Sequence, residues 1–200
     1  MPATKSKRPT IKEETISKSG KINVIILTAD KFEDMELFFP YFRLVEEGMK
    51  VDVAAPAKGR IRGENGYSLE VEKTFNQINP DNYDLLILPG GAPDGAPTTV
   101  RNNSKALSIA KSFFAANKPV AAICHGPYVL ISAGLLKGRK ATCFWGDGVP
   151  EEMKKAGAYY RDEEVVVDGN LVTSRYPMDL PAFMREIMNL LRAGRYSKSL

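Results

Sequence analysis

The residues best suited to chemistry are a cysteine and a histidine that follow one another, Cys124 and His125, in the segment AICHG. A small residue, the nucleophile and a following glycine at this spacing are typical of a nucleophile elbow, a sharp strand-to-helix turn that projects the central side chain. Amides at the start of the next helix would favour the thiolate and lower the pKa of Cys124. Gly126 would allow the tight backbone approach. The segment therefore predicts a cysteine nucleophile.

Two further turns carry groups that could assist this cysteine. The segment TADKFE ends at Glu33, whose carboxyl group could exchange a proton with the thiol or a substrate. The segment LPGG supplies Gly90 and Gly91, and one of their amides together with the amide of His125 could bind an oxyanion. All three turns follow apolar runs, and the carboxyl ends of parallel strands line one crevice of a sheet. We therefore expect the three turns to meet.

Each of these residues also has a structural interpretation. A lone cysteine is commonly a small packing residue, which is how we interpret Cys143 in its apolar strand. Glu33 could cap a helix, and the paired glycines could form a tight turn. Adjacent residues diverge at a sharp turn, so we do not expect a direct dyad of Cys124 and His125 within one chain.

Metal and cofactor sites are disfavoured by the same residues. A ligand set of Glu33, Cys124 and His125 would need two adjacent ligands, and the chain has a single histidine. Neither GxxxxGK[ST] nor GxGxxG occurs, so phosphate and dinucleotide loops are missing. We expect no metal and no cofactor.

Short apolar runs alternate with amphipathic stretches from residue 21 onward, which predicts an α/β sandwich with a mostly parallel sheet and helices on both faces. The Asn65-Gly66 and Asp168-Gly169 pairs predict hairpins. A helix is expected over 34–48, with a kink at Pro40. The other predicted strands are 22–28, 51–56, 83–91, 118–126 and 139–145, and the other predicted helices are 104–117, 127–133, 150–156 and 178–191.

The 200 residues suffice for one domain, which we place at 21–192. The net charge of +4 comes from the ends: residues 21–191 carry 20 basic and 22 acidic residues. We therefore expect basic tails at 1–20, which we expect to be disordered, and at 193–200, and no specific nucleic-acid or membrane partner. Two cysteines and no apolar run behind the first charges favour a cytoplasmic protein.

Four segments carry a resemblance to a known family: FEDMELFFPYFRLVEEG, YDLLILPGGAPDG, VAAICHGPYVLISAGLLKGRKAT and VVVDGNLVTSRYPMDLPAFMREIM. Together they resemble the ThiJ/PfpI superfamily over essentially all of 21–192, and most closely its PfpI branch. The resemblance implies a flavodoxin-like, class I glutamine amidotransferase-like sandwich and self-association as a dimer or hexamer.

The resemblance also implies roles for single residues. It makes Cys124 the nucleophile, Glu33 its hydrogen-bonded glutamate, and His125 the residue that completes the site. Gly90 and Gly91 match the oxyanion-binding amides. Hexameric members orient the histidine with a glutamate from a neighbouring subunit, and at the matching place this chain has Asp94, one methylene shorter.

These residues leave three functions open. The first is glyoxalase III or deglycase chemistry, in which Cys124 adds to methylglyoxal or its protein adducts and a hydroxy acid is released without glutathione. The second is a PfpI-type peptidase, with His125 as base and Asp94 of another chain as its orienter. The third is a thiol redox sensor or holdase chaperone.

Overall fold

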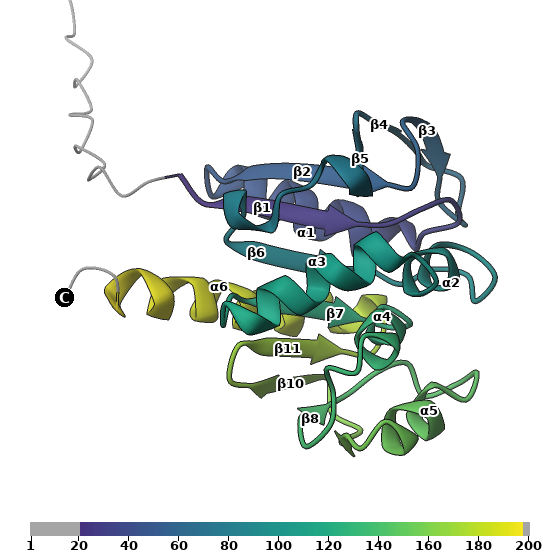
Figure 1. Cartoon of the computed structure of the whole chain (residues 1–200), viewed down its shortest axis with the longest axis vertical. Helices are drawn as coiled ribbons and strands as arrows, with labels where there is room; N and C mark the ends of the chain where they lie inside the picture. The colour runs from purple at the N-terminus through teal and green to yellow at the C-terminus, as the bar shows by residue number, and fades with distance from the viewer. Residues whose placement is uncertain (1–20, 198–200) are drawn as a thin grey trace, which may run out of the picture.

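The computed structural model describes residues 21–197, which form a central sheet of seven strands (Figure 1). The order across the sheet is β10-β11-β7-β6-β1-β2-β5, and each neighbouring pair is parallel except β10 with β11. The strands are β1 Asn23–Leu27, β2 Lys50–Ala55, β5 Lys73–Thr74, β6 Leu85–Leu88, β7 Val120–Ile123, β10 Val165–Asp168 and β11 Leu171–Ser174.

Helices cover the sheet in two layers. On one face α1 (Asp34–Glu46) packs beside α6 (Leu180–Ser197), and on the other α2 (Ala96–Arg101), α3 (Ser104–Ala115) and α4 (Pro127–Ser132) contact one another, with α5 (Val149–Lys155) next to α4 (Figure 1). Short 3-10 turns lie at Phe75–Gln77, Pro80–Asn82 and Pro177–Asp179. The predicted α/β sandwich is confirmed.

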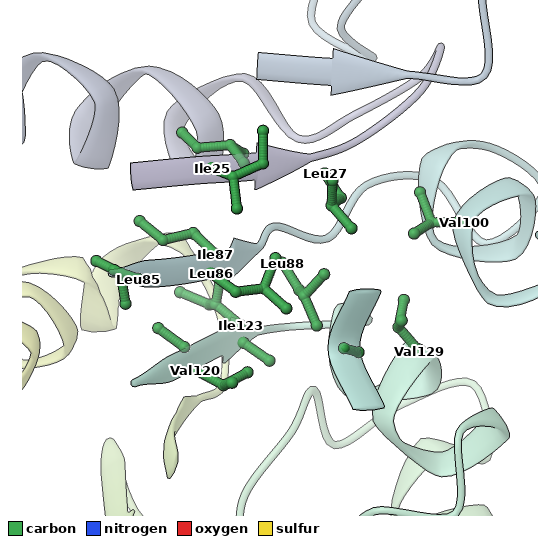
Figure 2. Close-up of a cluster of buried hydrophobic side chains, with 14 of the residues drawn as sticks. Ile25, Leu27, Leu85, Leu86, Ile87, Leu88, Val100, Val120, Ile123 and Val129 are labelled. Carbon is green, nitrogen blue, oxygen red and sulfur yellow. The ribbon is translucent and has the colours of Figure 1, made fainter. Parts of the chain in front are cut away.

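The three central strands are apolar on both faces because helices cover both. Every residue of β6 and β7 is buried, and β1 is buried from its second residue onward. Ile25, Leu86 and Ile123 are completely inaccessible to solvent and belong to the same buried cluster as Val100 of α2 and Val129 of α4 (Figure 2). This core fixes the carboxyl ends of β1, β6 and β7, from which the three candidate turns emerge.

Both predicted hairpins form. β10 and β11 pair across Asp168-Gly169, and β3 (Gly59–Arg62) pairs with β4 (Ser68–Val71) around Asn65-Gly66. The second hairpin docks on the start of α1, because the Asp34 carboxylate accepts the amides of Asn65 at 2.8 Å and Tyr67 at 2.9 Å.

Some boundaries differ from the expected ones. The strand predicted over 139–145 shortens to β8 (Lys140–Ala141), which pairs with β9 (Tyr159–Tyr160), and α2 was not predicted. Helix α6 continues to Ser197, so residues 193–197, expected in a tail, are helical. Pro40 lies inside α1, which runs continuously across it. The predicted tail at 1–20 lies outside the described residues.

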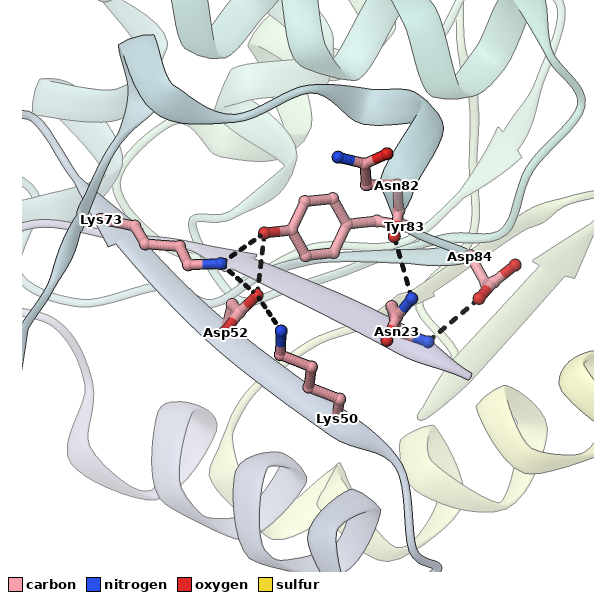
Figure 3. A network of polar contacts seen from close by, with 7 residues as sticks. All are labelled: Asn23, Lys50, Asp52, Lys73, Asn82, Tyr83 and Asp84. Carbon is pink, nitrogen blue, oxygen red and sulfur yellow. Dashed lines mark hydrogen bonds and ion pairs between the residues drawn. The ribbon is translucent and has the colours of Figure 1, made fainter. Parts of the chain in front are cut away.

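A polar network braces the sheet near the start of β2. Asp52 accepts hydrogen bonds from Lys73 Nζ at 2.6 Å and from Tyr83 Oη at 2.8 Å, while Lys50 lies 3.9 Å away (Figure 3). The amide of Asn23 donates to Asp84 nearby. Within residues 21–197, no helix is long and apolar enough to cross a membrane.

Candidate active site

Cys124 occupies the predicted elbow between β7 and α4. Its φ is +61°, a left-handed conformation that costs a non-glycine residue about 1–3 kcal/mol and is held only when the surroundings fix it. Two backbone hydrogen bonds do so: the Cys124 amide donates to Ser174 O at 3.1 Å, and the Phe144 amide donates to Cys124 O at 3.0 Å. A side chain on Gly126 would collide with the Leu88 carbonyl. The elbow is thus tied to its neighbours on both sides.

The carboxyl group beside the thiol belongs to Glu36, not to Glu33. A Cβ built on Gly90 would lie 2.7 Å from Glu36 Oε2 and 2.8 Å from Cys124 Cβ, so the two side chains meet across this glycine. The Gly90 amide donates to Glu36 Oε2 at 2.7 Å. Glu36 is completely buried, and its Oε1 has no hydrogen bond to a protein group of standard geometry among the described residues.

Glu33 serves as the cap of α1. Its Oε2 accepts the Glu36 amide at 2.7 Å, and its Oε1 lies 3.4 Å from Asn65 Nδ2. Both contacts hold the Glu33 carboxylate at the first turn of α1 and the β3–β4 turn, and neither involves Cys124. The predicted contact of Glu33 with Cys124 is therefore wrong, and the structural interpretation of Glu33 as a helix cap is the one that the structure shows.

Burial changes the proton balance of Glu36 and Cys124. The pKa of Glu36 lies well above its usual range because the carboxyl is desolvated and the charge of Glu33 is close, although the Gly90 amide and the thiol oppose this. Burial and the Glu36 charge also raise the pKa of Cys124, against the His125 amide. The expected lowering of the Cys124 pKa at the start of α4 is therefore wrong, since a buried pair of acids favours a single negative charge.

His125 lies between the thiol and a second carboxylate. Its Nδ1 is 3.3 Å from Cys124 Sγ, and its Nε2 is 3.0 Å from Asp147 Oδ2. The direct contact of Cys124 with His125 therefore exists within one chain, contrary to expectation, because the left-handed turn lets the imidazole fold back. Burial lowers the pKa of His125, and Asp147 opposes this.

The backbone amides of the two glycines in LPGG differ in their hydrogen bonding. The Gly90 amide is committed to Glu36, so it is not free for an oxyanion. Gly91 lies opposite Phe32 in an antiparallel bridge. The two hydrogen bonds of this bridge run from the Glu33 amide to Gly90 O and from the Ala92 amide to Lys31 O, so the Gly91 amide takes part in neither. Gly91 has a φ of +143°, and a side chain there would strike the Lys31 carbonyl. The amides of Gly91 and His125 remain the candidates for holding an oxyanion.

Asp94 lies on the surface rather than in this cluster. Its carboxylate pairs with Lys31, whose charge lowers the pKa of Asp94. Its proposed contact with the histidine of another subunit stays a prediction, because one chain is described. Among the described residues, 21–197, no group of three or more metal-binding side chains comes together.

Two residues of the site were missed from the sequence. Glu36 could have been found from helical spacing, since it shares a face with Leu37, Pro40 and Leu44, which face the core. Asp147 lies 22 residues after His125 in a loop between two glycines, and no spacing rule links the two.

A mostly parallel sheet with a cysteine in an elbow turn, a buried glutamate and a histidine at its carboxyl edge defines an α/β protein of the flavodoxin-like class. Residues 22–190 match the DJ-1/PfpI family, and the chain belongs to that family.

Relatives and solved structures agree with this assignment. Deglycase PfpI of Pyrococcus furiosus is 52% identical over 171 residues, which are 86% of this chain and all of the relative. YraA of Bacillus subtilis, which carries a provisional cysteine protease name, is 38% identical over 84% of this chain and 98% of its own. A two-domain protein of Anabaena variabilis with a DJ-1/ThiJ/PfpI-like and a ferritin-like domain superposes with a TM-score of 0.81 at 36% identity, over 86% of this chain and 48% of that one. The predicted relation to the PfpI branch is confirmed.

Proposed function

We propose that this chain is a cofactor-independent, cysteine-dependent enzyme that converts methylglyoxal, or its adducts on protein amines, to a hydroxy acid without glutathione. One observation carries the proposal: Cys124 is held in a strained elbow with the buried carboxyl of Glu36 beside its thiol. The deglycase relative of 52% identity supports this substrate class.

In the first step the Cys124 sulfur attacks the aldehyde carbon and forms a carbon–sulfur bond. The thiol proton passes to Glu36 or to His125 Nδ1, which both lie beside it. The amides of Gly91 and His125 hold the oxygen, which becomes the hydroxyl of a hemithioacetal. With an amine adduct, the same attack breaks the carbon–nitrogen bond, and the amine leaves with the proton.

In the second step a proton moves from the hemithioacetal carbon to the neighbouring carbonyl carbon through an enediol. This transfer converts the hemithioacetal to a thioester without any external oxidant. We assign the transfer to Glu36, because its carboxyl group lies beside the thiol and its raised pKa makes it a better proton acceptor than an ordinary carboxylate. Water then cleaves the thioester, releasing lactate and the free thiol.

Replacement of Cys124 tests this reaction directly. Cys124→Ala should abolish lactate formation from methylglyoxal, whereas Cys143→Ala, which removes the other buried cysteine, should leave it near the wild-type rate. Retained turnover in Cys124→Ala would exclude the mechanism. Parallel assays with fluorogenic peptides separate carbonyl chemistry from peptide hydrolysis.

Peptide hydrolysis is the second candidate, and the His125 contacts favour it. An imidazole placed between a thiol and a carboxylate is the arrangement of cysteine peptidases. If the purified protein cleaves no peptide in any oligomeric state, this candidate fails.

Self-association is also proposed, through the outer face of α1. Met35, Phe39, Phe42 and Val45 are between 42% and 61% exposed, and the first three line a groove of about 820 Å³ that Tyr67 borders. These side chains expose roughly 400 Å² of apolar surface, about half of the roughly 800 Å² that one partner buries in a stable interface. A second copy is the occupant that we propose. Phe42→Glu should therefore lower the mass in light scattering, and an unchanged mass would exclude this face.

The redox and location hypotheses stay predictions. Both cysteines are free and buried, as expected in a reducing cytosol. Intact mass after mild peroxide tests the sensor hypothesis, which fails if Cys124 gains no oxygen.

A further inference from the structure

We propose that Asp147 is a positioning residue that completes a Cys124–His125–Asp147 arrangement within a single chain. Asp147 holds the imidazole with a proton on Nε2, so that the unprotonated Nδ1 faces the thiol. The inference rests on the proposed function only in taking Cys124 as the nucleophile.

The geometry of the imidazole sets its tautomer. A neutral imidazole has one donor nitrogen and one acceptor nitrogen. The Asp147 carboxylate, 3.0 Å from Nε2, can only accept when ionised, so the proton belongs on Nε2. Nδ1 is then an acceptor at 3.3 Å from Cys124 Sγ, where it can take the thiol proton.

The loop that carries Asp147 is clamped to the site. Asp147 has a φ of +55°, and the following Gly148 has a φ of +73°. Tyr128 of α4 donates from its hydroxyl to Asp147 O at 3.2 Å, and the guanidinium of Arg101 lies 4.2 Å from the centre of the Tyr128 ring. Arg101 in turn pairs with Glu152 of α5. Helices α2, α4 and α5 therefore all hold this loop in place.

The base of the loop is joined to the nucleophile itself. The Phe144 amide donates to Cys124 O, and the Phe144 ring packs on His125 with centroids 5.0 Å apart. A movement of the loop would thus shift the cysteine backbone, the imidazole and the carboxylate together.

The charges around His125 agree with a neutral, oriented base. Asp147 raises the pKa of His125 against the effect of burial. The Cys124 thiol and the Glu36 carboxyl lie on the Nδ1 side of the ring. Beyond Tyr128, the positive charge of Arg101 is neutralised by its ion pair with Glu152. Asp147 is half-exposed, so solvent screens its charge and its effect on the pKa of His125 stays smaller than that of burial.

A carboxylate from the same chain makes a second subunit unnecessary for this contact. Asp94, predicted to reach the histidine of another subunit, is paired with Lys31 instead. The structure therefore favours a site whose activity does not depend on self-association.

His125 is the single histidine of the chain, so its ring nitrogens can be observed by ¹⁵N NMR without assignment ambiguity. The wild type should show the Nε2-protonated tautomer. Asp147→Asn keeps the shape and tolerates positive φ, and should lower the pKa of His125 because the carboxylate charge is removed. Asp147→Gly keeps the loop conformation and removes the acceptor, so it should lose the tautomer preference. Asp94→Asn should change neither property.

Kinetics provide the second readout. Asp147→Asn should lower kcat for lactate formation by roughly 10- to 100-fold with KM little changed, and Asp147→Glu should restore part of the rate. Phe42→Glu, on the α1 face, should keep the wild-type kcat.

Two results would overturn the inference: an unchanged tautomer and pKa in both Asp147 variants, or a loss of kcat in Asp94→Asn but not in Asp147→Asn. If the wild type does not convert methylglyoxal at all, the proposed function fails separately, and the NMR result still decides the role of Asp147.

Discussion

Two carboxyl groups at the central sheet, Glu36 in α1 and Asp52 in β2, have pKa values that are shifted in opposite directions. Burial alone would raise the pKa of Asp52, but hydrogen bonds from Lys73 and Tyr83 and the lysine charges outweigh it, so its pKa is lowered (Figure 3). Burial raises the pKa of Glu36 well above its usual range, and its nearest charge is another carboxylate, Glu33.

The difference separates a structural carboxylate from a reactive one. Asp52 is neutralised by cations and stabilises the folded chain as an anion. Glu36 receives one amide at Oε2, while Oε1 lacks a standard hydrogen bond to a protein group among the residues described. The raised pKa means that this buried carboxyl binds a proton more readily than an exposed one, and the adjacent Cys124 thiol is the group with which it can exchange one.

The largest expected effect is on turnover in Glu36→Gln. Removing the exchangeable proton should lower kcat for lactate formation by about 100-fold or more, near 2.7 kcal/mol of barrier. Glu33→Gln is the matched control, since it changes the helix cap: it should cost about 1 kcal/mol of unfolding free energy and leave most of the turnover. A greater loss of turnover in Glu33→Gln would restore the role that the resemblance implied for Glu33.

The next largest effect of Glu36→Gln should be on how the free energy of unfolding changes with pH. Because its pKa is raised on folding, its contribution is fully present below the ordinary carboxyl pKa and is lost as pH rises through the folded value. Between pH 5 and pH 8 the wild type should therefore lose more unfolding free energy than Glu36→Gln. Urea titrations at both pH values measure this, and parallel curves would show that Glu36 does not hold the proton.

Asp52→Asn should show the opposite pattern. A lowered pKa contributes stability that is present above the ordinary carboxyl pKa and is lost as pH falls through the folded value. The variant should lose about 1–3 kcal/mol of unfolding free energy at pH 7, and this deficit should shrink toward pH 3. Turnover should stay at the wild-type level. A drop in kcat without a change in stability would remove the distinction between the two carboxylates.

Tyr83→Phe should give the smallest effect. It deletes the hydrogen bond that Tyr83 donates to Asp52 and the weaker one that it accepts from Lys73, but the Lys73–Asp52 ion pair remains. We expect a loss of about 1 kcal/mol in urea unfolding. In the double variant with Asp52→Asn the two losses should not add, since both remove the same contact. Full additivity would mean that the network in Figure 3 is not coupled.

The sheet and the elbow were predictable because both depend on local sequence. Buried parallel strands are continuous apolar runs, and an AICHG turn constrains its own backbone whatever surrounds it. Cys124, His125 and Gly91 accordingly lie where the sequence indicated. Helix α2 escaped prediction because its six residues show no full helical period.

The partners of these residues were harder to predict. Glu33 and Glu36 are both acidic and three residues apart, and only the first helical turn decides that one caps while the other faces the core. Asp147 reaches His125 because α5 and Tyr128 fold its loop back over the elbow.

The sequence by itself determined the fold class, the family and the elbow position of Cys124, which we propose as the nucleophile, because strand pattern and turn chemistry are local properties. The tertiary structure decided which carboxyl group meets the thiol, which amide stays free for an oxyanion and which acid orients the imidazole. Those choices depend on desolvation and on distances of a few ångströms between segments far apart in the chain, and packing alone sets both.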